Sequence, residues 1–517
     1  MANILDLPPE IISAIITQMP GSAIKSLRAS CRQLHYHASP LLYPVLYLSC
    51  HQLDLDVFRL VVNDPHLLSG VQELVIDDTT LAPSFSNWRV YHAVACRDDL
   101  WPDRKRPYFS DGEVFDEPDR EWSHGPNKTL WELFMLVFKG HHENRLAHAD
   151  ISALKDALPK MRSLRSLVIT NRTADEEHAT GAQSRESSSP VVKMWRRLGT
   201  QRRERQPFPP RCDWWTAWGS TVSRVDDFTL DWLDDELERN INVSGLPYVD
   251  ESHDQDHGED SEPGHYLQYN SVRSIARETR GLLVALEVLG EPSIQPQLKE
   301  FRVDASHDIL DEIYQPGLPI RIFNHISPLT DPIVTGFAAA NNLSKFHLVI
   351  SNGHKYWDGE DTLQQGHVAR LLASVPQLEE LVFEAHAMST VAAIPEDLTF
   401  KRLRRVEFSC GDMVPATLKA FLERHSGTLE ELRIEYCNID PGEQEGKWED
   451  VVRDISSLQG EGVTKLQTAI LWLVYDFKPF TGCGKNNTME LDSGEDDKIY
   501  SWTYGVDDSL RLMLDED

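Results

Sequence analysis

The sequence predicts a mixed α/β (α+β) protein, with three N-terminal helices followed by an irregular solenoid of short parallel strands and helices. Near the N-terminus, apolar residues recur at helical spacing between proline and glycine residues that start and stop helices. Along the rest of the chain, short pieces of the form apolar-x-x-apolar-x-apolar alternate with helical stretches. This alternation of period 2 with period 3.6 is typical of a solenoid in which each repeat supplies one strand and one helix.

The segment from Ile4 to about Ser49 is predicted to fold into compact helices. Prolines in a first turn favour a helix over Glu10–Met19, which ends at Pro20-Gly21. A second helix begins at Ser22, and Ser39-Pro40 opens a third, short one. The apolar positions of the second helix recur at helical spacing and are Ile24, Leu27, Cys31 and Leu34.

The first helix is apolar nearly all round, because isoleucines occupy adjacent positions at 11–12 and 15–16. A surface helix of a small domain normally shows an apolar stripe about 100° wide. A module of some forty residues cannot cover the remaining apolar surface itself. We therefore expect one side of this helix to pack on the second helix and another to contact a partner or the rest of the chain.

Strand-like pieces are predicted beyond residue 70, each followed by a helical stretch or a long connection. They begin at Val71, Leu164, Val225, Leu298, Leu343, Leu378, Leu403, Leu429 and, more weakly, Leu466. The best of them runs from Leu429 to Ile439 and matches every position of the leucine-rich-repeat template. Helices are expected between strands, over 365–374 and 415–425 for example.

The predicted domains are an N-terminal module over 1–48, a repeat region over 49–491 and an acidic tail over 492–517. Insertions are expected at about 172–221, which is rich in serine and arginine, and at 250–264, which has acidic residues but no lysine or arginine. Such an acidic segment has too little apolar surface to bury, so disorder is expected there.

Composition excludes several classes of protein. A net charge of −31 over 517 residues argues against binding to nucleic acid or to an anionic membrane. Seven cysteines, with no C-x-x-C pair, argue against a disulfide framework or a structural zinc site. No apolar run approaches the length of a membrane span and no signal peptide is evident, so a cytoplasmic or nuclear protein is expected.

The N-terminal motif carries its residues in a definite order: Leu7-Pro8-Pro9-Glu10-Ile11-Ile12-x-x-Ile15, then Ile24-x-x-Leu27-Arg28-x-x-Cys31-Arg32-x-Leu34, then Ser39-Pro40-Leu41-Leu42-Tyr43. This order resembles the F-box family, most closely its fungal type. The resemblance implies a module that binds a Skp-type adaptor and through it a cullin and a RING subunit. It also implies that the rest of the chain holds a protein substrate for ubiquitin transfer. The adaptor-binding residues implied are Leu7, Pro8, Glu10, Ile11, Ile15, Ile24, Leu27 and Leu34.

Within the repeat region, the residue between the last two apolar positions of each strand should be exposed on the concave face. This places Val75 and Val168 on that face, and it gives four candidate substrate-binding residues, Arg302, His347, Glu407 and Arg433. Because the array is acidic, a basic partner surface is one expectation, and ordinary solvated surface charge is the other.

The sequence carries no recognisable catalytic or cofactor motif. His141-His142-Glu143 lacks the second histidine that H-E-x-x-H needs on the same helix face, and no phosphate-binding or nucleophile-elbow motif occurs. We therefore expect no catalytic residue, no metal and no cofactor. Two alternatives stay open: the helices only cap the repeat array, or they bind an adaptor as a scaffold without assembling an active ligase.

Overall fold

The computed structural model describes residues 7–77, 128–170, 280–304, 318–323, 327, 329–351, 363–385, 388–439, 448–460, 464–476 and 499–504. They form a mixed α/β structure with mostly parallel strands. The chain divides into two compact units. Unit 1 holds residues 1–298 with 304–314, and unit 2 holds residues 299–303 with 315–517.

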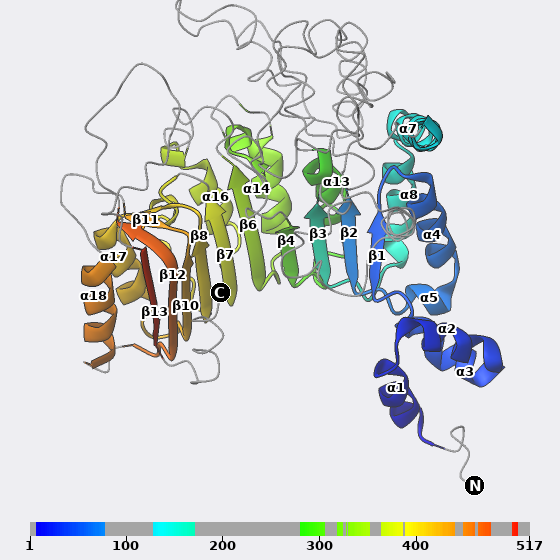
Figure 1. Cartoon of the computed structure of the whole chain (residues 1–517), viewed down its shortest axis with the longest axis horizontal. Coiled ribbons are helices and arrows are strands. Elements are labelled where there is room, and N and C mark those ends of the chain that lie inside the picture. The colour runs from blue at the N-terminus through cyan, green and yellow to red at the C-terminus, as the bar shows by residue number, and fades with distance from the viewer. Residues whose placement is uncertain are drawn as a thin grey trace, which may run out of the picture. The chain divides into compact units, whose positions relative to one another are not determined.

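The N-terminal module of unit 1 consists of short helices (Figure 1): α1 (Pro9–Thr17), α2 (Gly21–Ser30), α3 (Arg32–Ala38) and the 3₁₀ turn η2 (Ser39–Leu41). Prolines occupy the first turn of both α1 and η2, where a missing N–H costs nothing. The core of the module consists of Ile12, Ile16, Ile24, Leu34 and Ala38.

The single second helix expected from the spacing of Ile24 to Leu34 is wrong. The backbone is extended at Cys31 (φ −157°, ψ 164°), which ends α2 and caps α3 through its Sγ, 3.5 Å from the Leu34 N–H. Ser30 donates to the Leu27 carbonyl at 2.7 Å. Such local side-chain bonds compete with continuation of the helix.

The expectation of helices alone up to Ser49 is also wrong, because Val45–Leu48 forms strand β1. β1 pairs in parallel with β2 (Glu73–Asp77), and β2 with β3 (Ser166–Thr170). Only Leu42, Tyr43 and Pro44 separate η2 from β1. The module therefore runs directly into the first strand of the sheet in unit 1.

Contacts of Arg28 and Pro40 help to fix the N-terminal module to the rest of unit 1. Arg28 forms an ion pair with Asp64 at 3.1 Å, and within the module it donates to Ser39 Oγ at 2.9 Å. Gly70 lies so close to Pro40 that an added Cβ would stand 1.6 Å from the Pro40 carbonyl oxygen. Glycine is therefore required at position 70 for the module to seat against the loop before β2.

Replacing Gly70 by alanine is expected to lower the free energy of unfolding of unit 1 by about 1–3 kcal/mol, since backbone must move to admit the methyl group. Gly21→Ala is the matched control, because a Cβ there meets nothing within 4 Å. Urea unfolding followed by circular dichroism would measure both. Equal stability of the two variants would show that the contact with Pro40 is not tight.

The other helices described in unit 1 are α4 (Gln52–Asn63), α5 (Pro65–Leu68), α7 (Lys128–Leu146), α8 (Ala149–Ala157), the turn η5 (Leu158–Lys160) and α13 (Arg280–Leu289). A buried ion pair joins α8 to α13: both Asp150 carboxylate oxygens accept from Arg280 Nη2, at 2.8 and 2.9 Å. Burial opposes ionisation of Asp150, yet the charge and hydrogen bonds of Arg280 hold the pKa of that carboxyl below its usual range.

Unit 2 contains a run of parallel strands that pair in chain order (Figure 1): β4 (Glu300–Asp304), β6 (Lys345–Ser351), β7 (Glu380–Ala385), β8 (Arg405–Ser409), β10 (Glu431–Glu435) and β12 (Thr468–Asp476). β13 (Ile499–Tyr504) pairs antiparallel with β12 and lies within the segment predicted as an acidic tail. Shorter strands are β5 (Leu318–Pro319), β9 (Asp412–Met413) and β11 (Asn438–Ile439).

The described helices of unit 2 are α14 (Thr330–Ala339), α16 (His367–Ala373), α17 (Pro415–His425) and α18 (Trp448–Gly460), with 3₁₀ turns η9 (Ile320–Phe323) and η10 (Val391–Ala393). Phe337 of α14 packs edge-on against Phe301 and Phe346 of the sheet, with ring centroids 4.7 and 5.2 Å apart. Phe421 of α17 contacts Phe408 in the same way at 5.5 Å. One face of the strands thus packs against helices.

One hydrogen-bond junction recurs in both units. The carbonyl of the residue before a strand accepts N–H groups from two successive residues at the entry to the next strand, at 2.7–3.1 Å. The accepting residues are Pro44 and Gln72 in unit 1, and Lys299, Ser344, Glu379, Arg404 and Glu430 in unit 2. Each junction fixes the register of one strand on the one before it.

The predicted strands beginning at Val71, Leu164, Leu298, Leu343, Leu378, Leu403, Leu429 and Leu466 are confirmed, each starting about two residues later. The strand predicted at Val225 and both predicted insertions lie outside the described residues. Among the described helices, none is both long and apolar enough to cross a membrane.

Candidate functional site

The N-terminal module presents an apolar patch on and just before α1. Ile12 and Ile16 are fully buried in the module, whereas Ile11 is 48% exposed and Leu7 and Ile15 are each 37% exposed. These three side chains, named here the α1 patch, are among the largest apolar groups exposed in the described residues. The two-sided α1 expected from the sequence is therefore present, with one side in the core and one in solvent.

The other residues predicted to bind an adaptor fall into two groups. Pro8 and Glu10 are exposed beside the α1 patch. Ile24 and Leu34 are buried in the core of the module, and Leu27 packs against that core from its edge. Ile24 and Leu34 therefore shape the module and are not available as a contact surface in this conformation, whereas Leu27 is half-buried.

The second candidate surface is the face of the unit 2 strands opposite the buried phenylalanines. In β7, β8 and β10, half-exposed residues alternate with buried ones, as expected for strands with one covered face. This face is named here the charged face, and the titratable residues whose side chains are described on it are Glu300, Arg302, Lys345, His347, Glu380, Glu384, Arg405, Glu407, Glu431, Arg433 and Glu435.

The four predicted substrate-binding residues lie in one row across this face. In the strand register, Arg302 is the partner of His347, and His347 is the partner of Val382. Val382 is in turn the partner of Glu407, and Glu407 is the partner of Arg433. The spacing rule used for the sequence therefore brings these four side chains to one level of the sheet. It misses the neighbouring row, formed by Glu300, Lys345, Glu380, Arg405 and Glu431.

The same rule is wrong in unit 1, where it expected Val75 and Val168 on an open face. Both valines are buried, at 5% and 1% exposure. All positions of β2 and β3 are buried, because both faces of these strands are covered. A continuous apolar or buried run is typical of parallel strands that pack on both sides.

Ion pairs connect the side chains of the charged face from strand to strand. Arg405 of β8 reaches Glu380 of β7 at 3.2 Å, Glu407 of its own strand at 3.1 Å and Glu431 of β10 at 3.4 Å. Lys345 contacts Glu380 at 3.0 Å. Arg405 is thus one cation shared among carboxylates of three neighbouring strands.

The next row of side chains along the strands, which includes Glu384 and Glu435, is more acidic. His347 Nε2 lies 3.3 Å from Glu384, and Arg433 pairs with Glu435. Burial raises the pKa of Glu435 above its usual value; Arg433 counteracts this shift, and Glu407 and Glu384 add to it. These three carboxylates are therefore close enough to repel one another.

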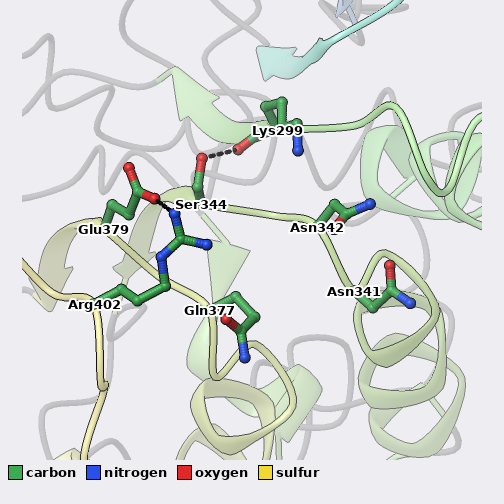
Figure 2. A pocket seen from close by; sticks show the side chains of 7 residues that line it. All are labelled: Lys299, Asn341, Asn342, Ser344, Gln377, Glu379 and Arg402. Atoms are coloured by element: carbon green, nitrogen blue, oxygen red, sulfur yellow. Dashed lines mark hydrogen bonds and ion pairs between the residues drawn. The ribbon is translucent and has the colours of Figure 1, made fainter.

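A polar hollow of about 490 Å³ lies at the strand-entry edge of the same unit (Figure 2). Its lining residues are Lys299, Asn341, Asn342, Ser344, Gln377, Glu379 and Arg402. Arg402 forms an ion pair with Glu379, and Ser344 donates to the Lys299 carbonyl. Amides, a hydroxyl and one ion pair offer hydrogen bonds to a polar ligand, but this lining contains no histidine or cysteine.

Two buried titratable side chains of unit 2, Cys437 and His425, lie among structural contacts. Burial raises the pKa of Cys437 to about 12, so it is a thiol rather than a thiolate nucleophile at neutral pH. His425 accepts from the Phe400 N–H through Nε2 at 3.1 Å and lies 2.9 Å from the Phe421 carbonyl through Nδ1. In the described residues, no three histidine, cysteine or acidic side chains are grouped so as to hold a metal ion.

The stability of unit 1 is expected to depend on the protonation of His51. Burial lowers the pKa of this histidine to about 4, and its ring lies 4.7 Å from that of His141. In the unfolded chain the ordinary pKa of about 6.5 applies, so the unfolded state binds more protons between these values. Stability is therefore present above about pH 6.5 and is lost as the pH falls toward 4.

The loss attributable to His51 should be about 2 kcal/mol between pH 7 and pH 5. Urea unfolding of the natural chain and of His51→Gln at both pH values isolates it, because the glutamine variant lacks this titration. If both proteins lose the same free energy on acidification, another group carries the effect.

A scan against protein-family models and a search of curated proteins find no match to this chain.

Proposed function

We propose that this chain is the substrate-recognition subunit of an SCF-type ubiquitin ligase. The N-terminal module acts as an F-box that binds a Skp-type adaptor, and the repeat region, an irregular leucine-rich-repeat solenoid, holds a protein substrate. Cullin and RING subunits join through the adaptor. The chain contributes position rather than chemistry, since proximity of substrate and reactive group is itself a large catalytic term.

The α1 patch is the observation that carries this proposal. Three apolar side chains of the α1 patch stay largely in solvent, while the core of the module buries five apolar residues and packs Met19, Leu27, Leu41 and Leu42 against them in part. A patch of this kind is typical of a contact surface for another protein. It occurs in the segment whose residue order resembles the F-box motif.

The recurring carbonyl junction supports the assignment of a repeat region. It joins strands at very different separations in the sequence, from Pro44 to Gln72 and from Gln72 to Arg165 in unit 1. A common geometry with variable connections is what an irregular solenoid with insertions requires.

Co-purification with a Skp-type adaptor tests the proposal. The full chain should recover the adaptor, and a version lacking residues 1–41 should not. This deletion keeps Pro44 and β1, which belong to the sheet of unit 1. Equal recovery of adaptor by the two versions would refute the proposal, whereas adaptor without a cullin would favour a scaffold over a ligase subunit.

A further inference from the structure

The charge on the charged face is unevenly distributed across its strands. On β7, β8 and β10 the carboxylates are Glu380, Glu384, Glu407, Glu431 and Glu435, and the guanidinium groups are Arg405 and Arg433. On β4 and β6 the described side chains are Glu300, Arg302, Lys345 and His347, and Arg302 pairs with Glu300 at 3.0 Å. The carboxylates of the face are therefore concentrated on β7, β8 and β10, which form its acidic part.

The carboxylates of the acidic part are partly shielded from water. The side chains of Glu384 and Glu435 are each 14% exposed and that of Glu407 is 17% exposed. Register places Glu384 and Glu435 at one level, on either side of Ser409, with Glu407 two residues earlier on β8. Neighbouring strands are about 4.8 Å apart, so the three carboxylates surround a short serine side chain within about 10 Å.

The internal cations leave negative charge on this part of the face. Arg405 is shared among Glu380, Glu407 and Glu431, Lys345 also contacts Glu380, and Arg433 pairs with Glu435 on its own strand, so three cations face five carboxylates. Glu384 lies 3.3 Å from His347. A cation supplied from outside would add favourable interactions where the carboxylates repel one another, and partly desolvated pairs are stronger than fully exposed ones.

We propose that the part of the charged face over β7, β8 and β10 docks a lysine- and arginine-rich segment of a protein substrate. The inference rests on the proposed function only in naming the bound protein a substrate. Docking itself depends on charge complementarity with the described side chains. The docking position lies over β7, β8 and β10 because the carboxylates of the face are concentrated there, whereas Arg302 and Lys345 are paired with Glu300 and Glu380.

The test uses the full chain and a fluorescent peptide of nine residues that alternates lysine and glycine. The face variant Glu384→Gln, Glu407→Gln and Glu435→Gln removes three carboxylates from the acidic part. The matched control, Asp331→Asn, Glu423→Gln and Asp454→Asn, removes the same charge from helices of unit 2. Each exposed or half-exposed ion pair between the peptide and the face contributes about a factor of two to three to the dissociation constant. The face variant should therefore bind the peptide about tenfold more weakly, and the control should bind it nearly normally.

Equal weakening of both variants, or equal binding of an otherwise identical glutamate peptide to the natural chain, would overturn the proposal. A photoreactive group on the lysine peptide gives a second measurement that needs no variant. Its cross-links to the natural chain should map to 380–384, 405–409 and 431–435, and cross-links confined to other segments would contradict the docking position.

Adaptor co-purification on the same proteins separates this inference from the proposed function. The natural chain and both variants should recover a Skp-type adaptor equally, because no substituted residue lies in the N-terminal module. If the adaptor never binds but the peptide docks on the face, the ligase assignment fails and the docking surface stands. If the adaptor binds and the peptide does not discriminate between the variants, only the docking surface fails.

Discussion

Replacing Ile15 by aspartate is expected to abolish co-purification of a Skp-type adaptor while the chain stays folded. Ile15 is 37% exposed in the α1 patch, so a carboxylate there remains in water in the free protein. In a complex the same group would be buried without a partner in an apolar contact, which costs several kcal/mol. Binding should therefore weaken by about 100-fold or more.

Ile16→Asp is the matched control for this prediction, one residue further along the same helix. Ile16 is fully buried in the core of the module. A carboxylate there should unfold the module itself, with a loss of helical circular dichroism as well as of adaptor binding. If Ile15→Asp behaves like Ile16→Asp, or if it binds the adaptor normally, the α1 patch is not the contact surface.

Replacing Arg280 by alanine is expected to destabilise unit 1 by about 3–5 kcal/mol, because Asp150 then stays buried without its main counter-ion. Both side chains are only 2% exposed. The surface pair Lys155–Glu287 joins the same two helices at 3.3 Å, with side chains 49% and 25% exposed. Lys155→Ala is therefore a matched control, expected to cost less than about 1 kcal/mol.

Urea unfolding of both variants measures this difference. The double variant Asp150→Leu with Arg280→Met should recover most of the lost stability, since apolar residues of similar volume often replace a buried ion pair without loss. A cost for Arg280→Ala no larger than for Lys155→Ala would mean that neighbouring groups compensate for Asp150.

Most described strands of the repeat region are predictable from the sequence, because each carries buried residues at a fixed spacing. β1 was missed although Tyr43-x-x-Leu46-x-Leu48 has the same spacing, with a tyrosine in the first apolar place. Accepting an aromatic residue at that position would have found the strand. The break at Cys31 has no such signal, because the apolar spacing continues through it and no glycine or proline marks it.

The candidate surfaces were predictable only in part. The spacing of apolar residues identifies which side chains point away from the core, and it therefore predicts Arg302, His347, Glu407 and Arg433. It does not show which strands are covered on both faces, and Val75 and Val168 were misplaced for that reason. The role of Arg405 depends on carboxylates up to 26 residues away in the chain, which only the strand register brings together.

The recurring carbonyl junction has a consequence for how such a chain tolerates change. Register is set where a strand is entered, by one carbonyl and two N–H groups, and not by the length of chain in between. The 93 residues from Gln72 to Arg165 end in the same junction as the 28 residues from Pro44 to Gln72. Lineages carrying this fold could therefore lengthen, shorten or exchange the connection after a strand while every later strand keeps its alignment. Sequence drift should accordingly be fastest between strands and slowest at the residues that flank strand entry.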